Sequence, residues 1–222
     1  MIKWGIIGLL MVFQQMGNAQ TTSVEIQFYY NGTTLDKTQS FENLNGDTFT
    51  LSAFRFYLSN VHLNTISSNT RNAFLIDLEE PASWKINVPK GESSNQEILY
   101  FNLGIDSLTS TSGAHGGHLD PTKGMYWAWQ SGYINFKIEG YSNSCDTRKN
   151  KFQFHIGGYQ SPYNALQFIV LPIRQNSDPL ILKVDMAPFF NQINLKKENT
   201  IMIPGMDALR LAEAAKKMFT IE

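Results

Sequence analysis

Hydrophobic and polar residues alternate with a period of two in short runs along most of the chain. In the first run Val24, Ile26 and Phe28 share one face opposite Glu25, and Asn31-Gly32 follows as a turn. This pattern is typical of a half-buried strand that ends in a tight turn. Runs of the same kind occupy residues 23–31, 54–63, 73–78, 96–103, 133–139, 151–157, 166–172 and 180–186.

Near the C-terminus the hydrophobic period lengthens to that of a helix. Apolar residues recur close to helical spacing between Asp207 and Phe219, and Lys216 and Lys217 lie in the last turn. This segment predicts one C-terminal helix of about three to four turns. Eight or so strands at short spacing followed by one helix predict an all-β fold, an antiparallel β-sandwich or a partly closed barrel.

The N-terminus has the features of a secretory signal. Lys3 precedes an apolar run from Ile6 to Phe13, and small residues lead up to Ala19, so residues 1–19 are predicted to be a signal peptide cleaved near Ala19. The alternative, a membrane anchor, would need about 20 apolar residues. We therefore expect a periplasmic or secreted protein that does not span the membrane, with residues 20–222 forming one domain.

Charge and cysteine content exclude several classes of function. The chain has 18 Lys+Arg and 19 Asp+Glu, and removing Lys3 with the signal leaves 17 − 19 = −2. No basic run is available to bind nucleic acid or anionic lipid. Residues 64–72 and 140–150 are polar and are predicted to be surface loops. Cys145, the sole cysteine, would be exposed in the second loop, able to bind a soft metal but more simply inert.

Histidines supply the candidate chemistry. His115 and His118 lie three residues apart in a glycine-bracketed loop and could converge on one ion if the loop curls. His155 would lie opposite the phenylalanines of its strand, toward solvent or a second layer, either as a ligand or as a solvated imidazole. His62 sits in a probable strand, where packing or solvation is the more ordinary role. Imidazoles suit copper, zinc, nickel or iron, and the lack of an acidic cluster argues against calcium.

Trp127 and Trp129 flank one alanine just after this histidine pair. A strand would place both indoles on the same face, where they could line a pocket, whereas a helical turn would splay them apart. Core packing is the ordinary role of such residues. Near a redox metal an indole is also oxidisable, so either tryptophan is a candidate for modification.

Hydrolase, nucleotide-binding and zinc-protease motifs are absent. The sequence has no G-x-S-x-G, P-loop, H-E-x-x-H or C-x-x-C motif. Its aspartates are scattered, mostly beside turn residues, and no catalytic carboxylate pair can be identified. We therefore expect a binding protein and not an enzyme.

Four blocks of the sequence resemble the MbnP-like copper-binding proteins of the bacterial periplasm. They are FRFYLSNV at 54–61, LDPTKGMYWAWQSGYINFKIEG at 119–140, FQFHIGGY at 152–159 and PGMDALRLAEAAKKMF at 204–219. The resemblance implies a β-rich periplasmic protein, related to surface copper proteins of methane oxidisers, in which histidines bind copper and a tryptophan can become kynurenine. It also implies a di-haem partner of the MauG or cytochrome c peroxidase type, which carries out that oxidation.

Carried over to this chain, the resemblance makes His155 the first candidate copper ligand. The second would be His118 or His115, and Trp127 or Trp129 would be the modified residue. Copper(I) is the favoured ion, since it accepts low-coordinate imidazole sites.

The alternative function is a β-sandwich module without a metal, which would bind a glycan or peptide. It would use Trp127, Trp129, Tyr126 and Tyr133 as a stacking surface. Exposure of these aromatics would favour that function, and their burial beside converging histidines would favour copper.

Overall fold

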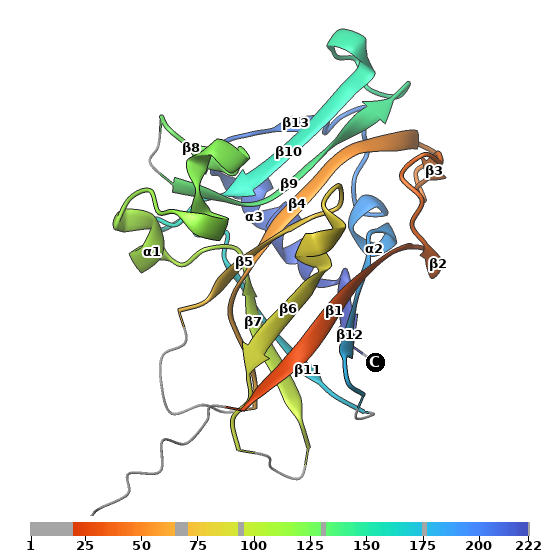
Figure 1. The fold of residues 1–222 in the computed structure, drawn as a ribbon. Helices are drawn as coiled ribbons and strands as arrows, with labels where there is room; N and C mark the ends of the chain where they lie inside the picture. Colours follow the sequence, from red (N-terminus) through yellow and green to blue (C-terminus); the bar gives the residue numbers. More distant parts are fainter. Residues whose placement is uncertain (1–19, 65–70, 93–95, 130–131, 175–176, 222) are drawn as a thin grey trace, which may run out of the picture.

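The computed structural model describes residues 20–64, 71–92, 96–129, 132–174 and 177–221. Most of the regular secondary structure in these ranges is strand, arranged in two sheets, and helix α3 lies near the C-terminal end, just before the last strand (Figure 1). The predicted β-sandwich with a C-terminal helix is therefore confirmed. The predicted signal peptide lies outside the described residues. Within the described ranges no helix is both long and apolar enough to cross a bilayer.

The smaller sheet joins the two ends of the described chain. Its order is β14-β12-β1-β2, and β6 also pairs with β1. β1 and β12 are parallel, with Val24 opposite Leu180, whereas the other pairs are antiparallel. Its strands are β1 (Thr21–Tyr30), β2 (Thr33–Thr34), β6 (Lys85–Pro89), β12 (Leu180–Asp185) and β14 (Phe219–Ile221).

The larger sheet carries the candidate site. Its order is β11-β7-β4-β9-β10-β13, with β3 and β5 also on β4 and β8 on β9. All its pairs are antiparallel except that of β10 with β13. Its strands are β3 (Phe41–Glu42), β4 (Thr48–Leu63), β5 (Ala73–Asp77), β7 (Ile98–Leu103), β8 (Tyr126–Trp127), β9 (Gly132–Ser142), β10 (Lys151–Gly157), β11 (Gln167–Pro172) and β13 (Thr200–Ile201).

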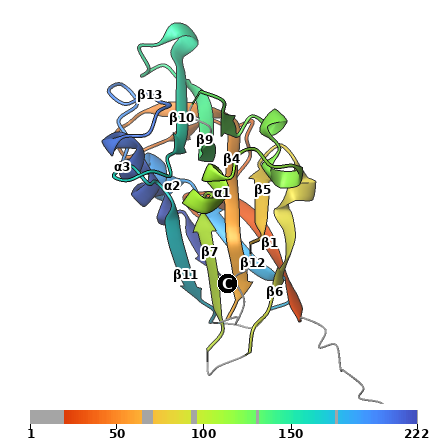
Figure 2. The same cartoon turned by 90° about the vertical axis from the view of Figure 1, so that its left-hand side faces the viewer.

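Short helices connect the strands and cover one end of the core. α2 and α3 lie together at one side of the sandwich (Figure 2). The helices are α1 (Ser107–Thr111), α2 (Ala187–Phe190) and α3 (Met206–Lys216), and the 3-10 turns are η1 (Pro81–Trp84), η2 (Gly117–Leu119), η3 (Pro121–Lys123) and η4 (Arg148–Asn150).

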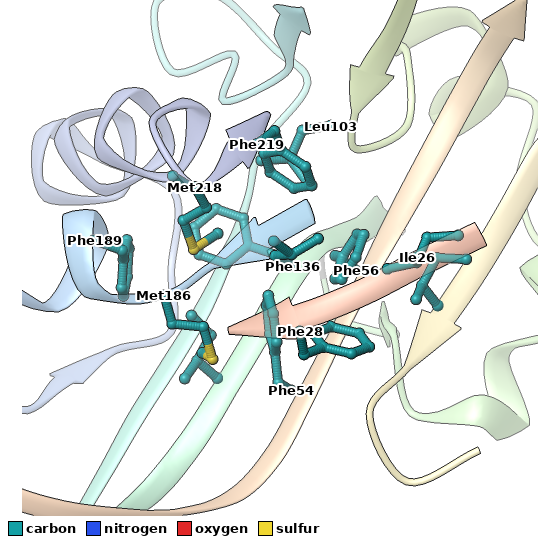
Figure 3. Packing of buried hydrophobic residues seen from close by; sticks show 14 of the residues in the cluster. Ile26, Phe28, Phe54, Phe56, Leu103, Phe136, Met186, Phe189, Met218 and Phe219 are labelled. Atoms are coloured by element: carbon teal, nitrogen blue, oxygen red, sulfur yellow. The ribbon is translucent and has the colours of Figure 1, made fainter. Parts of the chain in front are cut away.

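Aromatic side chains fill the space between the sheets. Phe28 of β1 packs edge-on against Phe54 of β4, with ring centroids 5.8 Å apart. Phe219 of β14 packs in the same way against Phe56, at 5.6 Å, and Phe101, at 5.5 Å. Figure 3 shows this packing, which Phe136, Phe189 of α2 and Met218, just after α3, complete. Such edge-to-face pairs add stability beyond the area they bury.

Two local predictions are wrong. Residues 207–219 were predicted to be helical, but α3 ends at Lys216 and Phe219 begins β14, because its ring is needed in the core and its backbone pairs with β12. Cys145 was predicted to be exposed, yet it is buried in the core cluster, because the turn after β9 folds back toward Asp47. Burial, together with the charge of Asp47, raises the pKa of this thiol to about 11.

Candidate functional site

The face of the larger sheet that points away from the core carries a second, smaller apolar cluster. We call this face the outer face. Tyr57 of β4 lies there, because it alternates with core-facing Phe56 and Leu58. The segment 104–129 covers the cluster and supplies several of its members. This outer cluster consists of Tyr57, Leu75, Ile105, Met125, Trp127, Tyr133 and Ile134.

Two tyrosine hydroxyls fasten the histidine-bearing loop to the outer cluster. The Tyr57 hydroxyl donates to the backbone oxygen of His118 at 3.2 Å. The Tyr133 hydroxyl accepts from the backbone N–H of His115 at 2.9 Å and donates to the oxygen of Leu119 at 3.1 Å. Burial raises the pKa of Tyr133, so its hydroxyl keeps the proton that it donates. The loop is therefore held in one place on the sheet.

A charged cluster centred on Glu139 lies beside the outer cluster on β9 and β10. The carboxylate of Glu139 accepts from Lys151 Nζ at 2.6 Å, from His155 Nε2 at 2.6 Å and from Gln153 Nε2 at 3.3 Å. The Nζ of Lys137 is 3.7 Å away. Burial acts to raise the pKa of Glu139, but these donors and positive charges prevail and lower it to about 2. Glu139 is therefore ionised at neutral pH.

His155 is a neutral imidazole with one nitrogen committed to Glu139. Burial lowers the pKa of His155, and the hydrogen bond to Glu139 only partly offsets this. Because an ionised carboxylate can only accept, Nε2 must carry the proton and Nδ1 must be the unprotonated nitrogen. The described residues make no hydrogen bond to Nδ1. Of the two environments expected for His155, solvent or a second layer, the structure shows the second, because the side chain is largely buried.

His118 belongs to a different part of the outer face. Its Nδ1 accepts from the backbone N–H of Leu75 in β5 at 3.3 Å, and burial lowers its pKa. It lines an open cavity of about 510 Å³ with Arg55 and Lys123. Strands β4 and β9 lie between β5, which holds His118, and β10, which carries His155. Three interstrand spacings, about 14 Å, therefore separate the two strands.

The remaining histidines are engaged elsewhere. His115 is exposed, with Nε2 2.8 Å from the Ser112 hydroxyl. His62 donates from Nδ1 to the oxygen of Asn60 at 2.9 Å and stacks on Tyr100. Among the described residues, no three His, Cys, Asp or Glu side chains are grouped so that they could hold a metal ion. A site using His155, His118 and His115 together is thus not assembled in this structure.

The two tryptophans have different environments. β8 ends at Trp127, so no single strand runs through both indoles, and the following turn leaves Trp127 6% exposed and Trp129 64% exposed. Their ring centroids are nevertheless 5.6 Å apart. The Trp127 ring rests on Gly157, where an added Cβ would lie only 3.0 Å from it. The Trp127 ring therefore contacts β10 at a position two residues beyond His155, on the same face of the sheet.

The sequence did not single out Glu139 as part of the site. A signal for it existed, since Lys137 and Glu139 alternate with core residues in the predicted strand 133–139. Pairing that strand with residues 151–157 as a hairpin would have placed Glu139 on the same face as His155. The register that joins them, with Lys137 opposite His155, appears only in the structure.

Comparison with known proteins gives a family and a related fold. The model of the MbnP family matches residues 19–203. The solved structure of MbnP from Methylosinus trichosporium is similar with a TM-score of 0.55 and 12% sequence identity, covering 91% of this chain and 98% of that one. None of the curated proteins matches the chain. At this identity, the likeness to the solved structure concerns the fold alone.

Proposed function

The chain belongs to the MbnP family, and we propose that it is an exported copper-binding protein that serves copper acquisition or trafficking. One observation carries this proposal. His155 is buried and neutral, its Nε2 donates to Glu139, and its Nδ1 receives no hydrogen bond from the described residues. Metal-binding histidines are usually held in this way, with one nitrogen on a carboxylate and the other on the ion.

The donors favour a low-coordinate soft ion. Structural zinc takes four protein ligands, and the described residues contain no group of three His, Cys, Asp or Glu that could begin such a site. Copper(I) accepts fewer ligands, and imidazole and thioether suit it. His155 would hold the ion, Glu139 would orient the imidazole, and Trp127 would shield one side. Copper, when bound, would supply a soft, redox-active cation, and the nitrogen that binds it must be unprotonated, as Nδ1 is in the neutral imidazole of His155.

Copper(I) titration of the exported protein against a competing chelator tests this function. The wild type should take up one equivalent of copper, and His155→Ala should abolish uptake. His115→Ala is the matched control, because that imidazole is exposed and lies on Ser112 away from Glu139. No uptake by the wild type would contradict copper binding, and full uptake by His155→Ala would contradict the site. Intact mass of the same sample tests whether the mature chain starts at Gln20.

Tryptophan oxidation by a di-haem partner of the MauG or cytochrome c peroxidase type is part of the proposal. Trp129 is exposed and could meet a partner protein, whereas Trp127 is buried and packs on Gly157, two residues from His155. Because the rings are 5.6 Å apart, oxidation begun at the exposed indole could reach the buried one. Peptide mass mapping of protein from the native host, with and without that di-haem protein, would show which residue changes. An unmodified pair in both samples would contradict this part.

Exposure of Trp129 also supports the alternative, a glycan- or peptide-binding module. The four aromatics do not form one open surface, however, because Trp127 and Tyr133 are buried in the outer cluster. Only Trp129 and part of Tyr126 remain for stacking. Titration with oligosaccharides, comparing the wild type with Trp129→Ala, tests this module directly. A saturable signal lost in the variant would favour it over copper.

A further inference from the structure

The pairing of β10 with β13 brings a candidate sulfur ligand toward His155. Gln153 pairs with Thr200 and Phe154 with Ile201, in parallel. β13 runs along the edge of β10 that β9 leaves free (Figure 1). β13 ends at Ile201, and one further step in the same register would bring the backbone of Met202 opposite His155, at an interstrand spacing of about 4.8 Å.

Alternation assigns Met202 to the outer face. Ile201 packs against the core cluster, next to its partner Phe154. Met202 is partly buried but is not among the residues packed against that cluster. Successive residues of an extended chain point to opposite faces. Continuing the alternation of β13 by one residue therefore assigns Met202 to the face where His155 and Glu139 lie.

Other soft donors in the described residues are poorly placed to meet an ion there. Cys145 is buried in the core. Met125, Met186 and Met218 are completely buried. Met206, which is 70% exposed, lies at the start of α3, beyond the turn that follows β13. Of the methionines described, Met202 is the one that combines partial exposure with the register of His155.

We propose that the thioether of Met202 is the second copper ligand, completing with His155 Nδ1 a two-coordinate imidazole–thioether site. This inference rests on the proposed copper function and names the partner that His115 and His118 do not supply. A thioether is a soft, uncharged donor that selects copper(I) over copper(II) and zinc. The site would lie at the β10–β13 edge, with Glu139 holding the imidazole from the β9 side.

Metal titration of single methionine variants tests the assignment. Met202→Leu should weaken copper(I) binding at least about tenfold, since even residues that only support a ligand cost that much when removed. Copper(II) binding should change less. Met206→Leu, a second accessible methionine four residues on, is the matched control. The substitution conserves volume, so thermal unfolding of both variants should match that of the wild type.

Methyl NMR provides a readout independent of affinity. In protein carrying ¹³C-labelled methionine methyls, the resonance absent from Met202→Leu should shift on adding copper(I) or silver(I), while that of Met206 stays. Copper binding that Met202→Leu leaves intact and His155→Ala abolishes would overturn the Met202 assignment and leave the copper function standing. No copper uptake by the wild type would overturn both. Weaker binding in Met206→Leu than in Met202→Leu would also overturn the assignment.

Discussion

Neutralising Glu139 should destabilise the protein and change its response to acid. The folded-state pKa of Glu139 is about 2, against an ordinary value of 4.5, because Lys151, His155, Lys137 and Gln153 surround the carboxylate. A pKa lowered on folding contributes stability that is fully present above pH 4.5 and is lost as the pH falls toward about 2. Glu139→Gln keeps the side-chain size and removes this contribution.

The size of the effect follows from the pKa difference. About 2.5 pH units at 1.36 kcal/mol each correspond to roughly 3.4 kcal/mol. The Glu139 side chain is 14% exposed and Lys151 is 30% exposed, so water screens part of the interaction. We therefore expect Glu139→Gln to lower the free energy of unfolding by about 1 to 2 kcal/mol at neutral pH.

Urea unfolding over a pH series measures this contribution. The wild type and Glu139→Gln should differ most at neutral pH and converge as the pH falls to about 2, where the carboxylate of Glu139 becomes protonated. Glu213→Gln is the matched control, since Glu213 is 65% exposed in its ion pair with Lys216 and should contribute little. A neutral-pH difference below about 0.5 kcal/mol, or parallel pH profiles for the two proteins, would refute the reasoning.

Three further outcomes are expected. Gly157→Ala should destabilise the protein by about 1 to 3 kcal/mol in urea unfolding, because its Cβ would lie 2.7 Å from a backbone oxygen and 3.0 Å from an indole ring. Gly116→Ala, with open space around it, should not, and equal effects would contradict the packing. Cys145 should react with a thiol reagent at about pH 8 only in unfolded protein, since burial raises its pKa to about 11, and rapid labelling of native protein would contradict this. His118 should titrate by NMR below its usual pKa of 6.5, so its contribution to stability should fall as the pH drops below 6.5, and His118→Gln should reduce that dependence, leaving the part that His155 contributes.

Local alternation predicted most of the strands, because each half-buried strand shows its two faces in its own sequence. β1 and β10 lie within two residues of their predicted bounds. β6 was missed because Lys85–Pro89 is short, mostly polar on one face and ends in proline. β4 begins at Thr48, six residues before the predicted start at Phe54, because an irregularity between Leu51 and Ala53 shifts the phase of the alternation, so that the upstream part does not continue the pattern of Phe54 and Phe56.

The sequence could not predict which histidines lie close together, because that depends on the order of strands in the sheet. Spacing put His115 and His118 together in a loop, but that loop is fastened over β5, whereas His155 belongs to β10. Neither segment contains a local pattern from which the two intervening strands, β4 and β9, could be predicted. The prediction for His155 succeeded in one respect, since alternation separated it from Phe154, and failed to foresee the charged neighbours that bury it.

The parallel pairing of β1 with β12 has a consequence for how the molecule acquires its structure. Residues 24–29 bond to residues 180–185, so the smaller sheet cannot close until nearly the whole chain is available. Contacts so distant in sequence delay folding, because the entropy of closing the loop must be met before they form. In the proposed export, a chain of this topology could close this sheet only after nearly all of it has left the membrane channel.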